Sequence, residues 1–446
     1  MKYFKTVMPY INYHFLMIIS ATLVLYFNYY AQAMSGLLPS YQAFANVIRA
    51  GFDTSITDYY PLTFPLWGYG FLMAISNNYL FLKIVQLTLA LSSVWYAIAV
   101  IEKNKLLKPA FISLLKALLV ICIPWYAFHT VLWPYSIASS LLIFSITMLY
   151  QASQQSSYFY WIISGLLFGI LLNFRSDYIL MPLGLSAIML WHSWSYTTIK
   201  KVILWISCIY LCLIPWALFT HKVCGHYLIT STNGGHHLLS GLGGNPHNKW
   251  GIAHINSDNC PVIHHFVKQI YGENAITWDY KGDKLLKKTF FNLIKKDPYE
   301  YIKKCFFNFK SLLKDGVYNG EFFMKNSMER DDNFDKNSLF FIKNGLHNPT
   351  LIKTFIAIKL QNISYWIASA VTSFSILSIF LCLFIAFITN NLFSLLINSI
   401  IIYQISMNTL CHHYSGYTSN VFLFFILNIL YLFQTTFSLS KKRVIL

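Results

Sequence analysis

The sequence predicts an α-helical multi-pass membrane protein of about ten transmembrane helices, with an outer-face first loop and a mixed soluble segment. Hydrophobic residues make up 56% of the chain and charged residues 11%, whereas soluble globular proteins average about 25% charged residues. The mean hydropathy is +0.50. Many apolar runs also approach the roughly 20 residues that one helical crossing of a bilayer needs. These observations exclude a disordered chain, a coiled coil and a small disulfide-stabilised fold.

The net charge of +17 indicates the kind of partner. In a soluble chain such an excess would suggest nucleic acid, but here much of it flanks apolar segments, where basic residues set membrane orientation. We therefore expect membrane lipid with anionic headgroups, or another phosphate group, as the partner and no nucleic acid.

Ten apolar runs are predicted to span the membrane because irregular backbone cannot face lipid. The first, at about 10–30, follows Lys2 and Lys5 and is interpreted as a retained signal anchor. All ten lie near 10–30, 79–101, 110–127, 134–150, 159–173, 178–194, 202–220, 363–388, 392–410 and 419–438. The fifth run contains Gly165 and Gly169, whose small-xxx-small spacing is typical of close helix packing.

Flanking lysines and arginines predict both termini on the cytoplasmic side of the cytoplasmic (inner) membrane. The chain then divides into a transmembrane module at 1–220, which includes the first outer loop at 32–78, an extracytoplasmic soluble segment at 221–351, and C-terminal transmembrane helices at 352–446. Within the soluble segment, a basic helical pattern over 283–313 is broken at Asp297-Pro298, which predicts two helices, the second starting at Pro298.

The first outer loop carries the candidate catalytic carboxylates. Its residues 40–53 predict an amphipathic helix closed by Gly51, and a segment rich in proline and aromatic residues at 59–67 is typical of a surface-lying stretch. Asp53 and Asp58 are its only acidic residues. A carboxylate just outside the bilayer can accept a proton from an acceptor hydroxyl or amine. The alternative for both is a solvated turn or a helix cap.

Two cations embedded in apolar sequence are candidate phosphate ligands. Arg175 lies between two spans at the outer face, and its planar guanidinium suits phosphate at headgroup depth. The alternative is that Arg175 reaches the interface or pairs with Asp177. Lys83 is the only charge between residues 79 and 100, and it is either a phosphate ligand or an interfacial anchor.

Fourteen histidines are present, without the spacing of a zinc site. We therefore predict no metal and no cofactor, and interpret the His236-His237 pair as polar loop residues or substrate contacts.

Four stretches together resemble one enzyme family. They are the first outer loop with Tyr41, Ala45 and Gly51, continued by Pro61 to Trp67 and Lys83; Ser164 to Gly169 running into Phe174 to Asp177; Pro215-Trp216 followed by Ser231 to Leu238 and Gly241 to Pro246; and Asp283 to Leu313. The order and content of these stretches are similar to the multi-span C-type glycosyltransferases that use polyprenyl-phosphate sugars. Within this family, the resemblance is to the branch that contains bacterial aminoarabinose transferases and protein O-mannosyltransferases.

This resemblance implies an inverting transfer of a sugar from a polyprenyl-phosphate donor to a glycolipid, glycan or protein acceptor at the outer membrane face. Basic residues would hold the donor phosphate, and an outer-loop aspartate would be the base. The resemblance also implies substrate contacts at positions such as Asn233 and Asn245.

The chain departs from the family at two places. Leu37 and Leu38 stand where members commonly have an acidic residue, so either Asp58 or Asp53 replaces that base or the protein binds lipid-linked sugar without transferring it. His412 and His413 stand where relatives often have Arg-Tyr, and they are candidate replacements for a phosphate ligand. The alternatives to a glycosyltransferase are a transporter or flippase of lipid-linked sugar, which would be expected to have repeats and broken helices, and a catalytically silent relative.

Overall fold

The structure is a computed structural model, and the elements in its described residues are helices. It describes residues 12–30, 38–56, 67–155, 157–252, 261–272, 275, 277–315, 349–411 and 418–443. No strand occurs within these ranges. The described part of the predicted soluble segment is therefore helical rather than mixed.

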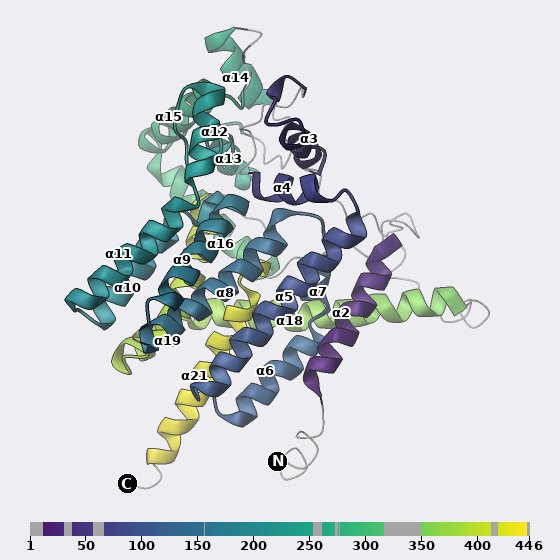
Figure 1. Cartoon of the computed structure of the whole chain (residues 1–446), viewed down its shortest axis with the longest axis vertical. Coiled ribbons are helices and arrows are strands. Elements are labelled where there is room, and N and C mark those ends of the chain that lie inside the picture. Colours follow the sequence, from purple (N-terminus) through teal and green to yellow (C-terminus); the bar gives the residue numbers. More distant parts are fainter. Residues whose placement is uncertain are drawn as a thin grey trace.

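A bundle of apolar helices forms most of the molecule. It contains α2 (Tyr13–Tyr30), α5 (Tyr79–Lys103), α6 (Pro109–Ile121), α7 (Ile123–Thr130), α8 (Pro134–Gln154), α9 (Phe159–Phe174), α10 (Met181–His192), α11 (Tyr196–Leu211), α12 (Ile214–Cys224), α18 (Pro349–Ile388), α19 (Leu392–Leu410) and α21 (Phe422–Arg443). The first helix begins and the last ends at the same end of the bundle (Figure 1). This all-helical bundle is compatible with a helical membrane protein.

Four of these helices are individually long and apolar enough to cross a membrane, namely α5, α8, residues 363–388 of α18, and α19. The count rises to six if α6 with α7, and α11 with α12, each form one span; these pairs bend by 55° and 41°. The helical, membrane-embedded class is thus supported, while the full set of ten crossings stays a prediction. Each of the ten predicted runs does coincide with one helix or one bent pair.

A serine from a distant helix holds the break between α6 and α7. Cys122 and Pro124 interrupt the helical bonding there, which leaves backbone groups without helical partners. Ser364 of α18 accepts a hydrogen bond from the Ile123 amide at 2.9 Å and donates one to the Ile121 carbonyl at 2.6 Å. One hydroxyl therefore satisfies both sides of the bend.

The predicted glycine packing in α9 is confirmed. A methyl group on Gly165 would lie 2.7 Å from the Trp205 carbonyl oxygen, and one on Gly169 would lie 2.7 Å from that of Ile209. Both contacts come from α11, so the missing side chains allow α9 and α11 to pack backbone to backbone.

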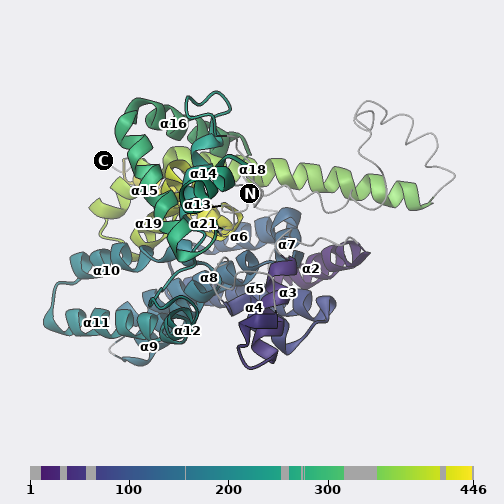
Figure 2. The same ribbon diagram turned by 90° about the horizontal axis from the view of Figure 1, so that it is seen from above.

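A second group of helices, here called the cap, covers the end of the bundle opposite the chain ends (Figure 1). It consists of α3 (Leu38–Arg49), η2 (Thr54–Ile56), α4 (Trp67–Ile75), α13 (Gly234–Gly241), η4 (Leu242–Gly244), α14 (Pro261–Tyr271) and α15 (Tyr280–Lys296). Seen from above, α13 to α15 lie on the side of α19 and α21, and α3 and α4 lie on the side of α5 (Figure 2).

Two residues, one aromatic and one charged, join α3 to its neighbours. Phe44 packs edge-on against Trp216 and Phe219 of α12, with ring centroids 6.3 and 5.7 Å apart. Arg49 donates to the Met73 and Ala74 carbonyls at the end of α4. The helix ends as the sequence predicts, because Gly51 has φ +69°, a conformation that suits glycine.

Helix α16 (Pro298–Asp315), within the predicted soluble segment, fastens the cap to the bundle. Its buried stripe at four-residue spacing is Glu300, Lys304, Asn308 and Leu312. The Lys304 ammonium donates to the Leu410 and Cys411 carbonyls, each at 2.7 Å. A cation thus provides hydrogen bonds to the last backbone carbonyls of α19, which have no donor within the helix. The predicted start at Pro298 is confirmed.

Candidate functional site

Arg175 and Asp177 form a pair at the carboxyl end of α9. The helix ends at Phe174, Arg175 is extended, and η3 (Ser176–Tyr178) turns the chain toward α10. The guanidinium of Arg175 binds Asp177 through two hydrogen bonds, Nε to Oδ1 at 2.8 Å and Nη2 to Oδ2 at 2.5 Å. The predicted alternative of pairing with Asp177 is therefore confirmed, and any role in binding phosphate is additional to it.

The pair is shielded from solvent, with Arg175 only 7% exposed. The guanidinium carbon lies 3.7 Å from the centroid of the Tyr135 ring, a cation–π contact from the start of α8. Within this environment the charges are screened less than at an open surface. Arg175 is therefore a fixed, oriented cation at the level where the bundle meets the cap.

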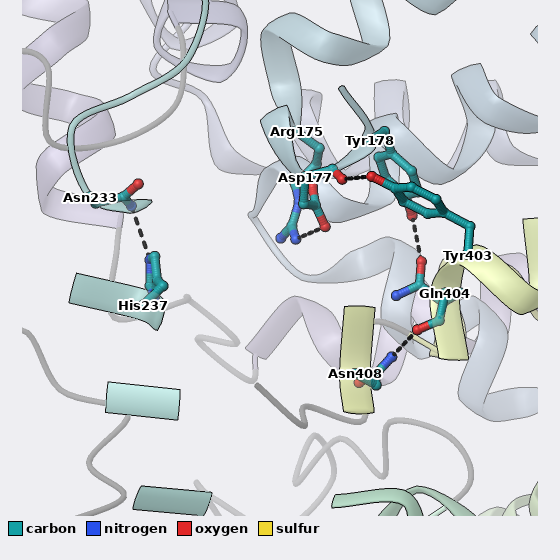
Figure 3. Close-up of polar contacts among 8 residues, drawn as sticks. All are labelled: Arg175, Asp177, Tyr178, Asn233, His237, Tyr403, Gln404 and Asn408. Carbon is teal, nitrogen blue, oxygen red and sulfur yellow. Dashed lines mark hydrogen bonds and ion pairs between the residues drawn. The ribbon is translucent and has the colours of Figure 1, made fainter. Parts of the chain in front are cut away.

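Helix α19 supports the same turn from the other side (Figure 3). The Tyr403 hydroxyl donates to the Asp177 carbonyl, and the Tyr178 hydroxyl donates to Gln404 Oε1 at 3.2 Å. The amide nitrogen of Gln404 is buried and has no hydrogen-bond partner among the described residues. A buried donor without a partner is costly, so Gln404 is a candidate ligand contact.

Helix α4, from the predicted first outer loop, also reaches the end of α9. A methyl group on Gly68 of α4 would lie 2.7 Å from the Asn173 carbonyl oxygen and 3.1 Å from the Phe174 ring. Only glycine allows this approach of α4 to the two residues before Arg175. The loop that carries the candidate carboxylates is thus attached beside the Arg175 pair.

His237 lies at the start of α13, where Asn233 and Ser231 orient it. The Asn233 amide nitrogen lies 3.0 Å from His237 Nε2, and the Ser231 hydroxyl donates to Asn233 Oδ1 at 2.6 Å. The His237 ring keeps accessible surface. Its pKa is nevertheless lowered, first by desolvation among the surrounding elements and then by Arg175, while Asp177 acts in the opposite direction. His237 is therefore close enough to sense both charges of the pair.

His236 and Asn245 have other surroundings. His236 is buried against the Trp278 ring, with centroids 4.1 Å apart, and burial lowers its pKa to about 3. Asn245 is buried in the turn after η4, where its side chain accepts from the His247 amide at 3.2 Å. Asn245 thus has the contacts of a packed turn, whereas both ring nitrogens of His236 are buried without a hydrogen-bond partner among the described residues.

Asp53 is exposed on the turn after α3. The Ser55 hydroxyl and amide donate to its carboxylate at 2.7 and 2.9 Å, and these bonds lower the pKa of Asp53. A carboxylate stabilised in this way is a weaker base, and its contacts are those of a capped turn. Its predicted catalytic role stays untested, and Asp58 lies outside the described residues, as do His412 and His413.

Lys83 is buried on the inner face of α5, one turn before Gln86. Gln86 bridges the bundle to the cap, since it accepts from the Tyr69 hydroxyl of α4 at 2.8 Å and donates to the Val131 carbonyl at 2.7 Å. The role of Lys83 as a phosphate ligand stays a prediction.

Sequence reasoning missed Tyr135, Gln404 and Lys304. The four-residue spacing of polar groups on α16 was a signal for Lys304, because a polar stripe on a helix that packs inward needs partners. No local signal identified Tyr135 or Gln404, which meet η3 only through the folding of distant helices. Among the described residues, no group of three or more histidine, cysteine or acidic side chains is placed to hold a metal ion.

Comparison with models of protein families, with curated proteins and with solved structures finds no match for this chain.

Proposed function

We propose that this chain is a membrane glycosyltransferase that moves a sugar from a polyprenyl-phosphate donor to an acceptor on the outer face of the cytoplasmic membrane. The proposal includes ten membrane crossings, with both termini cytoplasmic and the cap outside. The proposal follows from the resemblance found in the sequence. The acceptor is a glycolipid, a glycan or a protein.

The observation that carries the proposal is the setting of Arg175. A shielded guanidinium stands at the end of an apolar helix, beneath the cap and beside α4 of the first outer loop. A polyprenyl phosphate needs this combination, because its chain requires an apolar environment and its phosphate requires a cation at headgroup depth. The buried Gln404 amide offers a further donor beside the pair.

The chemistry assigns each group one task. The acceptor hydroxyl or amine attacks the anomeric carbon of the donor sugar as the bond from that carbon to the phosphate oxygen breaks, which inverts the configuration. The acceptor proton passes to the carboxylate of Asp58, with Asp53 as the alternative base. Arg175 stabilises the charge that develops on the leaving polyprenyl phosphate, which is the usual role of a preorganised cation.

Sugar transfer in proteoliposomes tests the proposal, with a panel of radiolabelled polyprenyl-phosphate hexoses and pentoses as donors and total membrane lipid, glycan and protein as acceptors. Arg175→Lys keeps the charge and removes the planar fork, so we expect about a hundredfold slower transfer. Asp58→Asn should abolish transfer while Asp53→Asn leaves it within about twofold. Full activity of Arg175→Lys and Asp58→Asn would refute the assignment of these roles.

The bent pairs α6 with α7 and α11 with α12 favour a second candidate, a transporter of lipid-linked sugar, because discontinuous helices are typical of transporters. A fluorescent polyprenyl-phosphate sugar, assayed for movement between leaflets in the same proteoliposomes, separates the two. Movement without any product would favour the transporter.

A further inference from the structure

A short chain of hydrogen bonds determines which ring nitrogen of His237 carries the proton. The Asn233 amide nitrogen can only donate, so His237 Nε2, 3.0 Å away, must accept. The orientation of that amide is set in turn by the Ser231 hydroxyl, which donates to Asn233 Oδ1 at 2.6 Å. Ser231 and Asn233 are both buried. The neutral imidazole therefore carries its proton on Nδ1, the nitrogen that these hydrogen bonds leave as a donor.

The charges around α13 favour this neutral form. Desolvation lowers the pKa of His237, and Arg175 lowers it further because the positive charge of Arg175 acts more strongly on the ring than the negative charge of Asp177. From α15, Asp283 faces α13, but its carboxylate accepts from the Gly235 amide and from Lys287, each at 2.6 Å. His236 on the same helix is a further titratable neighbour, and His236 in turn interacts with His264 of α14. At neutral pH the ring is thus an uncharged donor.

The orientation of the side chains brings this donor toward the cation. In Figure 3 the Arg175 guanidinium and the Gln404 amide nitrogen are directed toward the side on which Asn233 and His237 lie. The elements involved are the end of α9, α19 and α13, so the bundle contributes the charge and the cap contributes the neutral donor. A cation and a neutral donor together suit an anion with several oxygens.

We propose that His237 Nδ1–H and the Arg175 guanidinium bind oxygens of one phosphate group, and that Ser231 and Asn233 are positioning residues that keep the proton on Nδ1. The inference rests on the proposed function in taking this group to be the phosphodiester of a polyprenyl-linked sugar. Inorganic phosphate has the same oxygen chemistry and is the alternative source. A phosphodiester has a single negative charge, and Arg175 already supplies one cation for it. A neutral donor therefore suits the remaining oxygens.

Binding of a short-chain prenyl methyl phosphodiester tests the inference separately from catalysis, because this probe has one charge that does not titrate near neutrality. The full-length protein in nanodiscs is titrated with it between pH 6 and 8.5. We expect wild-type affinity to vary by less than about twofold over this range. His237→Phe removes the donor and should weaken binding about tenfold. His265→Phe, an exposed histidine of α14, is the matched control and should leave binding unchanged.

Asn233→Asp gives a signature that a purely structural role would not produce. The new carboxylate raises the pKa of His237 and accepts a hydrogen bond from Nε2–H, so the neutral ring keeps its proton on Nε2 and presents a lone pair instead of a donor at Nδ1. Binding should therefore be near wild type at pH 6, where the ring is a cation, and fall more than about tenfold by pH 8.5. If this variant does not fold, ring ¹⁵N spectra of the wild type decide the tautomer, with His237→Phe identifying the signal.

Three results would overturn the inference: equal binding by His237→Phe and wild type, wild-type affinity that rises about tenfold for each unit of falling pH, or a proton on Nε2. If His237→Phe binds the probe as the wild type does and sugar transfer is intact, this inference is refuted and the proposed function is not. The predicted binding pattern without transfer by the wild type would instead refute the proposed function and leave the anion site. If inorganic phosphate binds with the same affinity as the probe, the assignment of a lipid-linked phosphodiester as the ligand is overturned.

Discussion

The two glycines that begin α13 provide a sharp test of how the cap holds His237. A methyl group on Gly235 would lie 2.4 Å from the Asp283 carbonyl oxygen and 2.9 Å from Leu286 Cβ. The backbone and a buried leucine of α15 cannot yield at these distances, so α13 would have to move. On Gly234 the nearest atom would be the Lys287 Cε at 3.2 Å, and that flexible chain end can move aside.

The expected cost follows from what the movement breaks. Overpacking costs about 1–3 kcal/mol, and loss of the Gly235 hydrogen bond to the Asp283 carboxylate costs about 1.5–3 kcal/mol. The better helix propensity of alanine returns at most about 1 kcal/mol. We therefore expect Gly235→Ala to destabilise the protein by about 3 kcal/mol, and Gly234→Ala to be neutral within about 0.5 kcal/mol.

Thermal unfolding in detergent and hydrogen exchange of residues 231–241 measure the difference. For a chain of 446 residues, 3 kcal/mol corresponds to a Tm about 3 °C lower, because the entropy of unfolding scales with length. Gly235→Ala should also speed exchange in α13 and weaken phosphodiester binding, since His237 moves with the helix. Identical Tm values and exchange rates for the two alanine variants would refute the packing argument.

Further predictions concern one link within the bundle and one between α16 and the bundle. Ser364→Ala removes both bonds at the bend of α6 and α7 and should cost about 2 kcal/mol in denaturant unfolding, whereas Ser378→Ala on the same helix, whose hydroxyl binds only within α18, should cost less than about 0.5 kcal/mol. Lys304→Met leaves the end of α19 without its cation and should cost about 3 kcal/mol, whereas Lys310→Met, at an exposed position of the same helix, should leave stability unchanged within about 0.5 kcal/mol. Burial lowers the pKa of Lys304 from 10.5 to about 8, so the native state loses this proton before the unfolded state does. Stability should therefore rise between about pH 8 and 10.5, and a wild-type slope that persists in Lys304→Met would contradict this cause.

Several elements were predictable because their signals are local. The amphipathic pattern and Gly51 fixed the extent of α3, and Asp297-Pro298 correctly separated α15 from α16. The spacing of Gly165 and Gly169 identified the packed face of α9. Such patterns act over one or two helical turns, so they can be recognised before the tertiary structure is known.

The candidate site was only partly predictable. The sequence identified Arg175, Asp177, Asn233 and His237, and the structure shows the first two paired and the last two joined by a hydrogen bond. It did not separate His237, which senses Arg175, from the neighbouring His236, which is buried on Trp278. Adjacent residues on a helix point about 100° apart, so their roles depend on what packs against each face.

Composition and the order of apolar runs determined the class of this protein, because the partition of side chains between lipid and water depends on the side chains themselves. Only the tertiary structure decided three of the contacts described above. Arg175 lies against Tyr135, Tyr403 and Gln404 support η3, and Lys304 caps α19. Each joins residues from different helices, Lys304 and Leu410 being 106 positions apart, and only the packing of the whole bundle sets those distances.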